Sequence, residues 1–305
     1  MFPPITLPTK RGRRRRASRN RVERQLRVSL PLSGEMVTVP SGTLLHNGRR
    51  HMDFRQLASA ITSCPEIPRA RMSANHPCAK IVGLQREDAF QSPEPWRGHI
   101  ETAPILFVSS NPSIGGEYTF PPSGWSDEQV VSYYLGCFDH HVEGGYQVDE
   151  RKFARVQFWR EVRARASELL GRPAVQGEDF AITEVVHCKS TREQGVKEAL
   201  ELCVQRWMEP VIERCAAKVI VVLGSYARRV CSACWNLDGK RRVHFDVSTP
   251  GKDRTVVLLP HPNAREKRKL LHHTTDQERL SLRSQLAAEA RMTELEEEPR
   301  RLRGE

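Results

Sequence analysis

The chain has 305 residues, enough for one large domain or two small ones, and a formal net charge of +11 at pH 7. It contains no apolar run near the roughly 20 residues of a membrane-spanning helix, and its first apolar segment is short and followed by arginines, unlike a secretory signal. Its eight cysteines fall short of the density of a disulfide scaffold, which indicates a reducing cytoplasm and leaves metal ligation, catalysis or core packing as their roles.

The positive charge is concentrated at the N-terminus. Residues 1–30 hold ten Lys or Arg against Glu23 alone, a net charge of +9, so the remaining residues carry only +2. The sequence therefore predicts a basic, largely disordered N-terminal extension over residues 1–50, of a kind that favours polyanions such as nucleic acid. A solvated extension without a partner is the alternative.

The rest of the chain alternates helical and strand patterns. Helices are expected from residue 51 to about residue 63, over 150–170 and 196–211, and as a charged helix over 275–297. Four apolar runs have the pattern of buried strands, at 105–109, 180–186, 218–223 and 255–259. Strands separated by helices predict an α/β fold of three layers, α/β/α, with a central, mostly parallel four-stranded sheet.

The first strand runs into a polar loop that contains Ser110, Asn111 and Pro112, followed by Gly115 and Gly116. Open α/β sheets bind ligands at such strand ends, although an ordinary βα turn is the alternative. Polar residues also end two other strands. Because the carboxyl ends of parallel strands meet at one edge, we expect Asn111, Glu184 and His261 to converge on one cavity.

Four segments, in this order and spacing, resemble the uracil-DNA glycosylase superfamily over about residues 60–275. The segment 110–112 resembles the water-activating motif of the mismatch-specific and single-strand-selective branches, where Gly-x-Asn-Pro is usual. The segment 259–263, Leu-Pro-His-Pro-Asn, is similar to the family's His-Pro-Ser motif. The segment 182–188, Ile-Thr-Glu-Val-Val-His-Cys, and the strand that ends in Leu223-Gly224 are similar to segments of the iron–sulfur branch.

The resemblance implies hydrolysis of the N-glycosidic bond of a damaged base flipped out of DNA. The base leaves as an anion from an oxocarbenium-like state, so the protein must position a water and stabilise the leaving base. By the resemblance, Asn111 orients the water and His261 donates a hydrogen bond to the base. An asparagine that caps the turn and a histidine that caps a strand end are the alternatives.

A flipped base stacks on an aromatic ring. The resemblance favours Phe120 as that platform, with Tyr118 as second candidate and Ser110 as a further base contact; loop packing is the alternative. A basic segment follows His261, and in this family the corresponding loop enters the minor groove. We therefore expect DNA contacts from Asn263, from Ala264 or Arg265 as a wedge, and from Lys267 and Arg268 at phosphates, with a solvated charged helix as the alternative.

Four cysteines are candidate ligands of a [4Fe–4S] cluster. Cys188 and Cys203 are fifteen positions apart in the sequence, which is close to the separation of the last two cluster ligands in the iron–sulfur branch. Cys64 and Cys78 are the candidate upstream pair. That branch supplies its upstream pair from a close Cys-x-x-Cys, whereas these two are fourteen positions apart, and Cys203 also fits a core position on a helix. A cluster and simple packing both stay open.

Glu184 departs from the family pattern, because the iron–sulfur branch has an asparagine there that reads uracil through its amide. An ionised glutamate only accepts hydrogen bonds, which brings uracil selectivity into question, whereas a protonated one can donate. Glu184 is also a candidate for reading an exocyclic amine or for activating the water.

These observations predict a monomeric DNA-repair glycosylase that hydrolyses the bond to uracil or a related deaminated base, located in the cytoplasm at the nucleoid, with DNA as partner and no membrane contact. The glycosylase-like domain is expected over residues 51–274, with a charged helix and tail over 275–305. A non-catalytic or differently specific nucleic-acid-binding relative with the same fold is the alternative. The excised base and the preference for single or double strands stay open.

Overall fold

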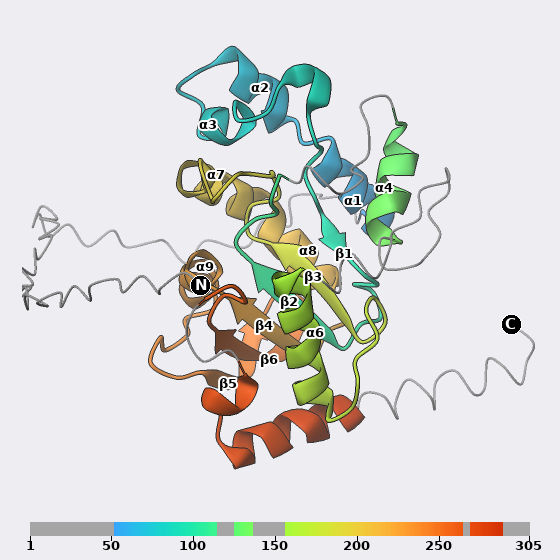
Figure 1. Cartoon of the computed structure of the whole chain (residues 1–305), viewed down its shortest axis with the longest axis vertical. Coiled ribbons are helices and arrows are strands. Elements are labelled where there is room, and N and C mark those ends of the chain that lie inside the picture. The colour runs from blue at the N-terminus through green and yellow to red at the C-terminus, as the bar shows by residue number, and fades with distance from the viewer. Residues whose placement is uncertain (1–51, 115–124, 137–155, 265–268, 289–305) are drawn as a thin grey trace, which may run out of the picture. The chain divides into compact units, whose positions relative to one another are not determined.

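The computed structural model describes residues 52–114, 125–136, 156–264 and 269–288 (Figure 1). The chain separates into two units, Met1–Gly48 and Arg49–Glu305, and all described residues belong to the second. The extension predicted over 1–50 therefore lies outside the described residues. Within the described part of the chain, no helix is long and apolar enough to cross a membrane.

Within the described residues, six strands form one sheet in the order β1-β3-β2-β4-β6-β5. The four inner strands are parallel, whereas β1 and β5 pair antiparallel at the two edges. The bounds are β1 Trp96–Arg97, β2 Ile105–Ser109, β3 Phe180–Glu184, β4 Val219–Leu223, β5 Val243–Thr249 and β6 Lys252–Leu259. The predicted parallel strands are confirmed, but the predicted count of four is wrong because it misses both edges.

The missed strands lack the apolar run that marks an inner strand. β1 is only two residues long, and β5 alternates buried and exposed positions as edge strands do. A break in the β5–β6 register between His244 and Val247 interrupts the alternation further.

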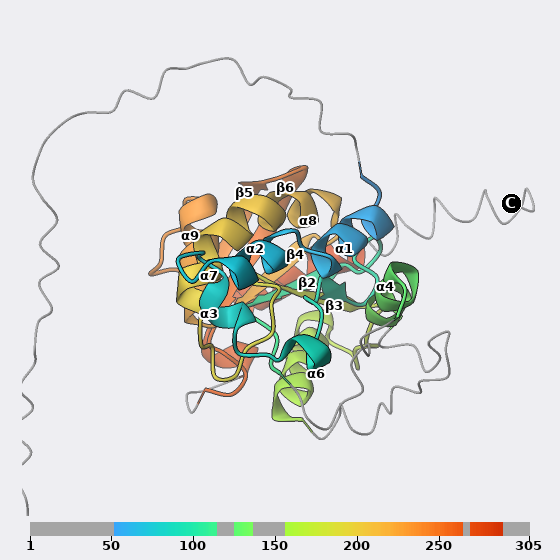
Figure 2. The same cartoon turned by 90° about the horizontal axis from the view of Figure 1, so that it is seen from above.

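Helices cover both faces of the sheet, with α6 on the side opposite α7 and α8 (Figure 2). The bounds are α1 Phe54–Thr62, α2 Glu66–Met72, α3 Ala79–Val82, α4 Asp127–Leu135, α6 Gln157–Leu170, α7 Val196–Cys203, α8 Glu209–Arg214 and α9 Ser225–Cys234. Short 3₁₀ turns cover η1 Glu87–Ala89 and η3 Leu270–His272, a π-helical turn covers η2 Val204–Met208, and a last helix covers 276–288. Residues 150–155 of the helix expected over 150–170 lie outside the described part of the chain.

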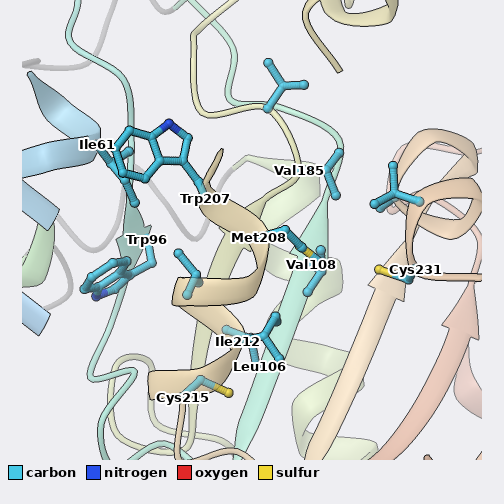
Figure 3. Packing of buried hydrophobic residues seen from close by; sticks show 14 of the residues in the cluster. Ile61, Trp96, Leu106, Val108, Val185, Trp207, Met208, Ile212, Cys215 and Cys231 are labelled. Carbon is cyan, nitrogen blue, oxygen red and sulfur yellow. The ribbon is translucent and has the colours of Figure 1, made fainter. Parts of the chain in front are cut away.

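Side chains that alternate along the strands fill a separate core on each face. Leu106 and Val108 of β2 point to one face, where they lie against Ile212 and Met208 (Figure 3). Ile105 and Phe107 point to the other face and pack with α6. The expected three layers thus follow from the two-residue period of the inner strands.

The helix expected over 196–211 is interrupted. α7 ends at Cys203, the wide π-helical turn η2 follows, and α8 begins with Pro210 in its first turn. A proline lacks the N–H that a continuous helix requires, but a helix start leaves that N–H unused. The helix type therefore changes over Val204–Met208, directly before the helix that contains Pro210.

The helix over 276–288 has a narrow apolar face that packs on the sheet. Leu282 and Leu286 are buried in the same core as α6. The sequence shows few apolar positions there, yet two leucines one turn apart are enough to fix this helix against the domain.

Gly195, immediately before α7, takes a backbone conformation that favours glycine, with φ of +76°. A Cβ there would lie 2.5 Å from the backbone nitrogen of Ile81 in α3. We expect Gly195→Ala to lower the free energy of unfolding by about 3 kcal/mol, because strain and overpacking add.

Urea unfolding of the two proteins measures this loss. Gly239→Ala is the matched control, since the nearest atom to a Cβ there is 3.8 Å away, at the end of the Arg228 side chain. Equal stability of the Gly195 and Gly239 variants would show that the loop before α7 is free to shift.

Candidate active site

The loops that follow β2 and β3 are hydrogen-bonded to each other beyond the ends of the strands. The N–H groups of Val185 and Val186 donate to the carbonyls of Ser109 and Ser110, each at 3.0 Å. Further along, the N–H of Ser190 donates to the carbonyl of Pro112 at 3.0 Å. The backbone around Asn111 is therefore held as firmly as a strand, although it has no strand periodicity.

A cavity of about 450 Å³ opens at this edge of the sheet, within the size range of small-ligand sites. Its lining includes Asn111 after β2, His261 after β6, and Glu193 on the loop between β3 and α7. The N-terminus of α9 also borders it at Ser225, which offers unpaired backbone N–H groups to an anion. The structure thus places Asn111 and His261 at one cavity, as predicted from their positions at the ends of parallel strands.

The amide of Asn111 has a defined orientation. Its Nδ2 donates to the carbonyl of Pro112 at 2.8 Å and to Oγ of Ser190 at 2.7 Å. A carbonyl only accepts, so the atom that faces it must be the nitrogen. Both amide hydrogens are used in this way, and no hydrogen bond engages the amide oxygen among the described residues. Asn111 therefore offers an acceptor, which suits it to hold a water.

Two contacts on the ring of His261 and one on the preceding backbone hold the ring in place. Phe158 of α6 packs on it with ring centroids 5.5 Å apart, and a Cβ on Gly224 would approach the ring to 3.4 Å. Arg165 donates to the carbonyl of Pro260 at 2.9 Å, which fixes the preceding residue. The position of the ring is thus set by packing and by the backbone.

The protonation of His261 follows from one hydrogen bond. The N–H of Asn263 donates to its Nδ1 at 3.1 Å, so the neutral ring carries its proton on Nε2. Burial lowers the pKa of His261, Glu193 acts in the opposite direction, and Arg165 lowers the pKa further. The ring is therefore neutral at pH 7 and offers an Nε2–H donor.

Glu184 is not among the residues that line this cavity. Its side chain is buried at the end of β3, and its Oε2 has no hydrogen-bond partner among the described residues. Burial, and next the charge of Glu94, raise the pKa of Glu184 to about 8, against the opposing effects of Arg97 and Lys189. The carboxyl is therefore mostly protonated at pH 7, and the structure does not support the expected meeting with Asn111 and His261.

The charged neighbours of Glu184 form a buried network centred on Glu94. Glu94 accepts from both nitrogens of the Arg97 fork, with Nη2 at 2.7 Å, and from Nζ of Lys189 at 2.6 Å. Arg97 and Lys189 hold the pKa of the Glu94 carboxyl well below its usual range despite burial. Arg97 and Lys189 by themselves favour an ionised Glu184, but burial and the charge of Glu94 outweigh them.

The four predicted cysteine ligands line a single cavity. Cys64 lies between α1 and α2, Cys78 directly before α3, Cys188 after β3 and Cys203 at the end of α7. Burial, and next the neighbouring Cys203, Cys64 and Cys78, raise the pKa of the Cys188 thiol. Segments distant in sequence therefore bring four free thiols together.

Four thiols are the donor set that a [4Fe–4S] cluster takes. Within the described residues, no group of three or more His, Cys, Asp or Glu side chains is arranged to hold one metal ion. Apolar residues and the aromatic Trp207 fill the rest of the lining, with Glu66 and Arg206 as its charged members.

A model of the Uracil DNA glycosylase superfamily matches residues 95–284, more than half of the chain. The chain belongs to the uracil DNA glycosylase superfamily. No curated protein matches the chain. The match includes Asn111, His261, Cys188 and Cys203. The other two predicted cluster ligands, Cys64 and Cys78, precede it. The superfamily predicted from the motifs is confirmed, and the iron–sulfur branch stays a prediction.

Several residues predicted to contact base or DNA lie outside the described part of the chain: Tyr118, Phe120, Arg265, Lys267 and Arg268. Ser110 lines the cavity, as expected of a base contact. Asn263 and Ala264 form the turn after His261, where the N–H of Ala264 donates to the His261 carbonyl at 2.8 Å. Their backbone shapes this end of the site.

Three residues of the site were not predicted from the sequence. Phe158 and Arg165 were assigned only to a helix, and nothing in the sequence indicates that they contact the segment around His261. Glu193 was missed because it lies in a polar stretch, Ser-Thr-Arg-Glu-Gln-Gly, that is typical of a solvated loop. No periodicity or spacing marks any of the three.

The raised pKa of Glu184 predicts a pH-dependent contribution to stability. Between the ordinary value of 4.5 and about 8, the folded protein keeps a proton that the unfolded chain releases, so stability falls as pH rises through this window. Glu184→Gln keeps the size of the side chain and removes the ionisation. We expect the variant to gain stability relative to the wild type as pH rises from about 5 to about 8.

Thermal unfolding of both proteins across this pH range measures the effect, and the difference between them cancels the other titrating groups, such as the buried His187. A constant difference at all pH values would mean that Glu184 is already ionised in the folded protein.

Proposed function

We propose that the protein is a monofunctional DNA glycosylase that hydrolyses the N-glycosidic bond of uracil or a related deaminated base. Proteins of this superfamily act on DNA. The observation that carries the proposal is the shared cavity, in which the acceptor of Asn111 and the donor of His261 come from different strand ends. They provide a group that can orient a water and a group that can stabilise the leaving base.

The division of roles follows from the hydrogen bonds. The amide oxygen of Asn111 accepts from a water and orients it toward the sugar. As the glycosidic bond lengthens, negative charge grows on the base, and the Nε2–H of His261 stabilises it without transferring its proton. A neutral donor suffices, which agrees with the lowered pKa of His261. Backbone N–H groups at the start of α9 suit a neighbouring phosphate.

Glu184 supports a preference for bases that carry a carbonyl. A protonated carboxyl with an unpartnered oxygen can donate to O4 of uracil or O6 of hypoxanthine, whereas the amino groups of cytosine and adenine offer no acceptor there. For this contact the base must reach past the cavity lining to the end of β3. Ser109, the β-sheet partner of Glu184, directly precedes the cavity residue Ser110.

We also propose that the four cysteines hold a [4Fe–4S] cluster. The arrangement of the thiols supports it, and bound thiolates would tie four segments together in place of a larger apolar core. Cys188 and Cys203 lie at the two ends of the segment formed by α7 and the preceding loop, which carries Ser190 and Glu193, so ligation by both cysteines would fix that loop at the active-site cavity. The proposed role is therefore structural.

The reaction is tested with oligonucleotides that contain uracil, hypoxanthine or a mismatch, followed by alkali to cleave abasic sites. We expect strand cleavage for uracil or hypoxanthine, with Asn111→Ala and His261→Ala each reducing the rate about 100-fold or more. His272→Ala is the matched control, since this histidine is exposed and lies outside the cavity lining. Unchanged rates in both site variants would refute the assignment, and binding without cleavage would favour a non-catalytic relative.

The cluster is tested on protein purified without air. We expect visible absorbance with about four iron atoms per chain, and loss of both in Cys188→Ser, which removes one of four thiolates. Cys234→Ser is the control, because Cys234 is exposed and does not line the cavity. A colourless, iron-free wild-type preparation would remove the cluster from the proposal and leave the cysteines as packing residues.

A further inference from the structure

Glu193 places a carboxylate at the cavity that Asn111 and His261 line. Its Oε1 accepts a 2.6 Å hydrogen bond from the hydroxyl of Ser110, which directly precedes Asn111 and is only 4% exposed. Its charge also acts on the pKa of His261. Glu193 is exposed as a residue, yet its carboxylate is bound to the buried Ser110 beside Asn111 and lies close enough to His261 to affect its pKa.

The backbone that carries Glu193 is strained. Arg192 and Glu193 have φ of 52° and 59°, a conformation that residues other than glycine rarely adopt and that costs of the order of 1 kcal/mol each. Gly195, two residues on, anchors the loop against Ile81. The surrounding contacts therefore hold Glu193 in a geometry that its own preference opposes.

The charge of Glu193 is also unfavourable for the proposed ligand. DNA is a polyanion, and a carboxylate at the mouth of its binding cavity repels phosphates. The amide of Asn111 is not a base, and both nitrogens of the neutral His261 are engaged, because Nδ1 accepts from Asn263 and Nε2 carries the proton that faces the leaving base. The cavity therefore has an acceptor that can orient water and a donor for the leaving base, and among its described lining residues Glu193 is the group suited to accept the proton.

We propose that Glu193 is the general base of the glycosylase reaction and that Ser110 positions its carboxylate. The inference rests on the proposed function and deepens it. Glu193 lies on the loop after β3, whereas the residue that the sequence offered for this role was Glu184. The buried, protonated Glu184 does not line the cavity, which leaves water activation to Glu193.

The step balances with water as the only co-reactant. The water held by Asn111 forms a bond from its oxygen to C1′ while the glycosidic C–N bond breaks. One proton of the water passes to Glu193, and the electron pair of the broken bond leaves with the base, stabilised by His261. The base takes up a proton on release and Glu193 returns its proton to solvent, which yields an abasic site and the free base.

Glu193→Gln separates catalysis from structure. The glutamine oxygen still accepts the bond from Ser110, but the amide cannot take a proton. We expect single-turnover cleavage to fall about 100-fold, within the range for a general base, while DNA binding is unchanged or tighter because a negative charge is gone. Glu198→Gln is the control: Glu198 is on the same helix-loop segment, is exposed, and pairs with Lys80 at 2.9 Å.

Glu193→Gly provides the second variant. Glycine accepts the positive φ without strain, so we expect a melting temperature equal to or above that of the wild type, together with loss of cleavage. Added formate, which supplies a carboxylate in the space vacated, should restore part of the rate in Glu193→Gly and leave Glu193→Gln unaffected.

The outcomes separate this inference from the proposed function. If the wild type and Glu193→Gln cleave at the same rate, Glu193 is not the general base, and the proposed glycosylase function is unaffected. Loss of DNA binding in step with the loss of cleavage would assign Glu193 a purely structural role. A wild type that cleaves none of the oligonucleotides would refute the proposed function itself, and with it this inference.

Discussion

The candidate site depends on the pairing of the β2 and β3 segments continuing past the strands themselves. Hydrogen bonds from Val186 to Ser110 and from Ser190 to Pro112 extend the parallel ladder into what would otherwise be two loops. A polar loop at a sheet edge would normally be mobile, and an amide side chain on it would have no fixed direction. Here the same ladder that fixes the backbone also supplies Ser190 and the Pro112 carbonyl, which orient the Asn111 amide.

A second consequence of this arrangement is a separation of buried and accessible acids. Glu94 is ionised between two cations, Glu184 is kept neutral by burial beside it, and Glu193 lies at the solvent-facing cavity. Three carboxyl groups at one end of the sheet thus lie in three different environments. Burial and charge partners decide the ionisation of Glu94 and Glu184, as they do wherever one fold uses carboxyls for different tasks.

The sequence predicted what depends on local pattern and on strand order. Four apolar runs gave the inner strands, and the common edge of parallel strands brought Asn111 and His261 together as expected. The four cysteines also share one cavity, although their spacing is unusual. Glu184 does not line the cavity of Asn111 and His261, and its neighbours Glu94 and Lys189, which are 95 residues apart, could not be inferred from the local pattern. Glu193 could not be predicted, because its position depends on a backbone conformation with positive φ, which a glutamate in the sequence does not indicate.

The π-helical turn after Cys203 has a consequence for the length of this segment. The wide turn holds one more residue than a regular helix would, and it places Cys203, Arg206 and Trp207 together at the cysteine cavity. A π turn accommodates one inserted residue at nearly the same total rotation as four residues of an α-helix, so removing one residue would leave α7 and α8 in nearly the same orientation around the helix axis. Only the side chains within the turn would change direction, so a relative of this chain that lacked this residue would keep both helices and present a different lining to the cavity.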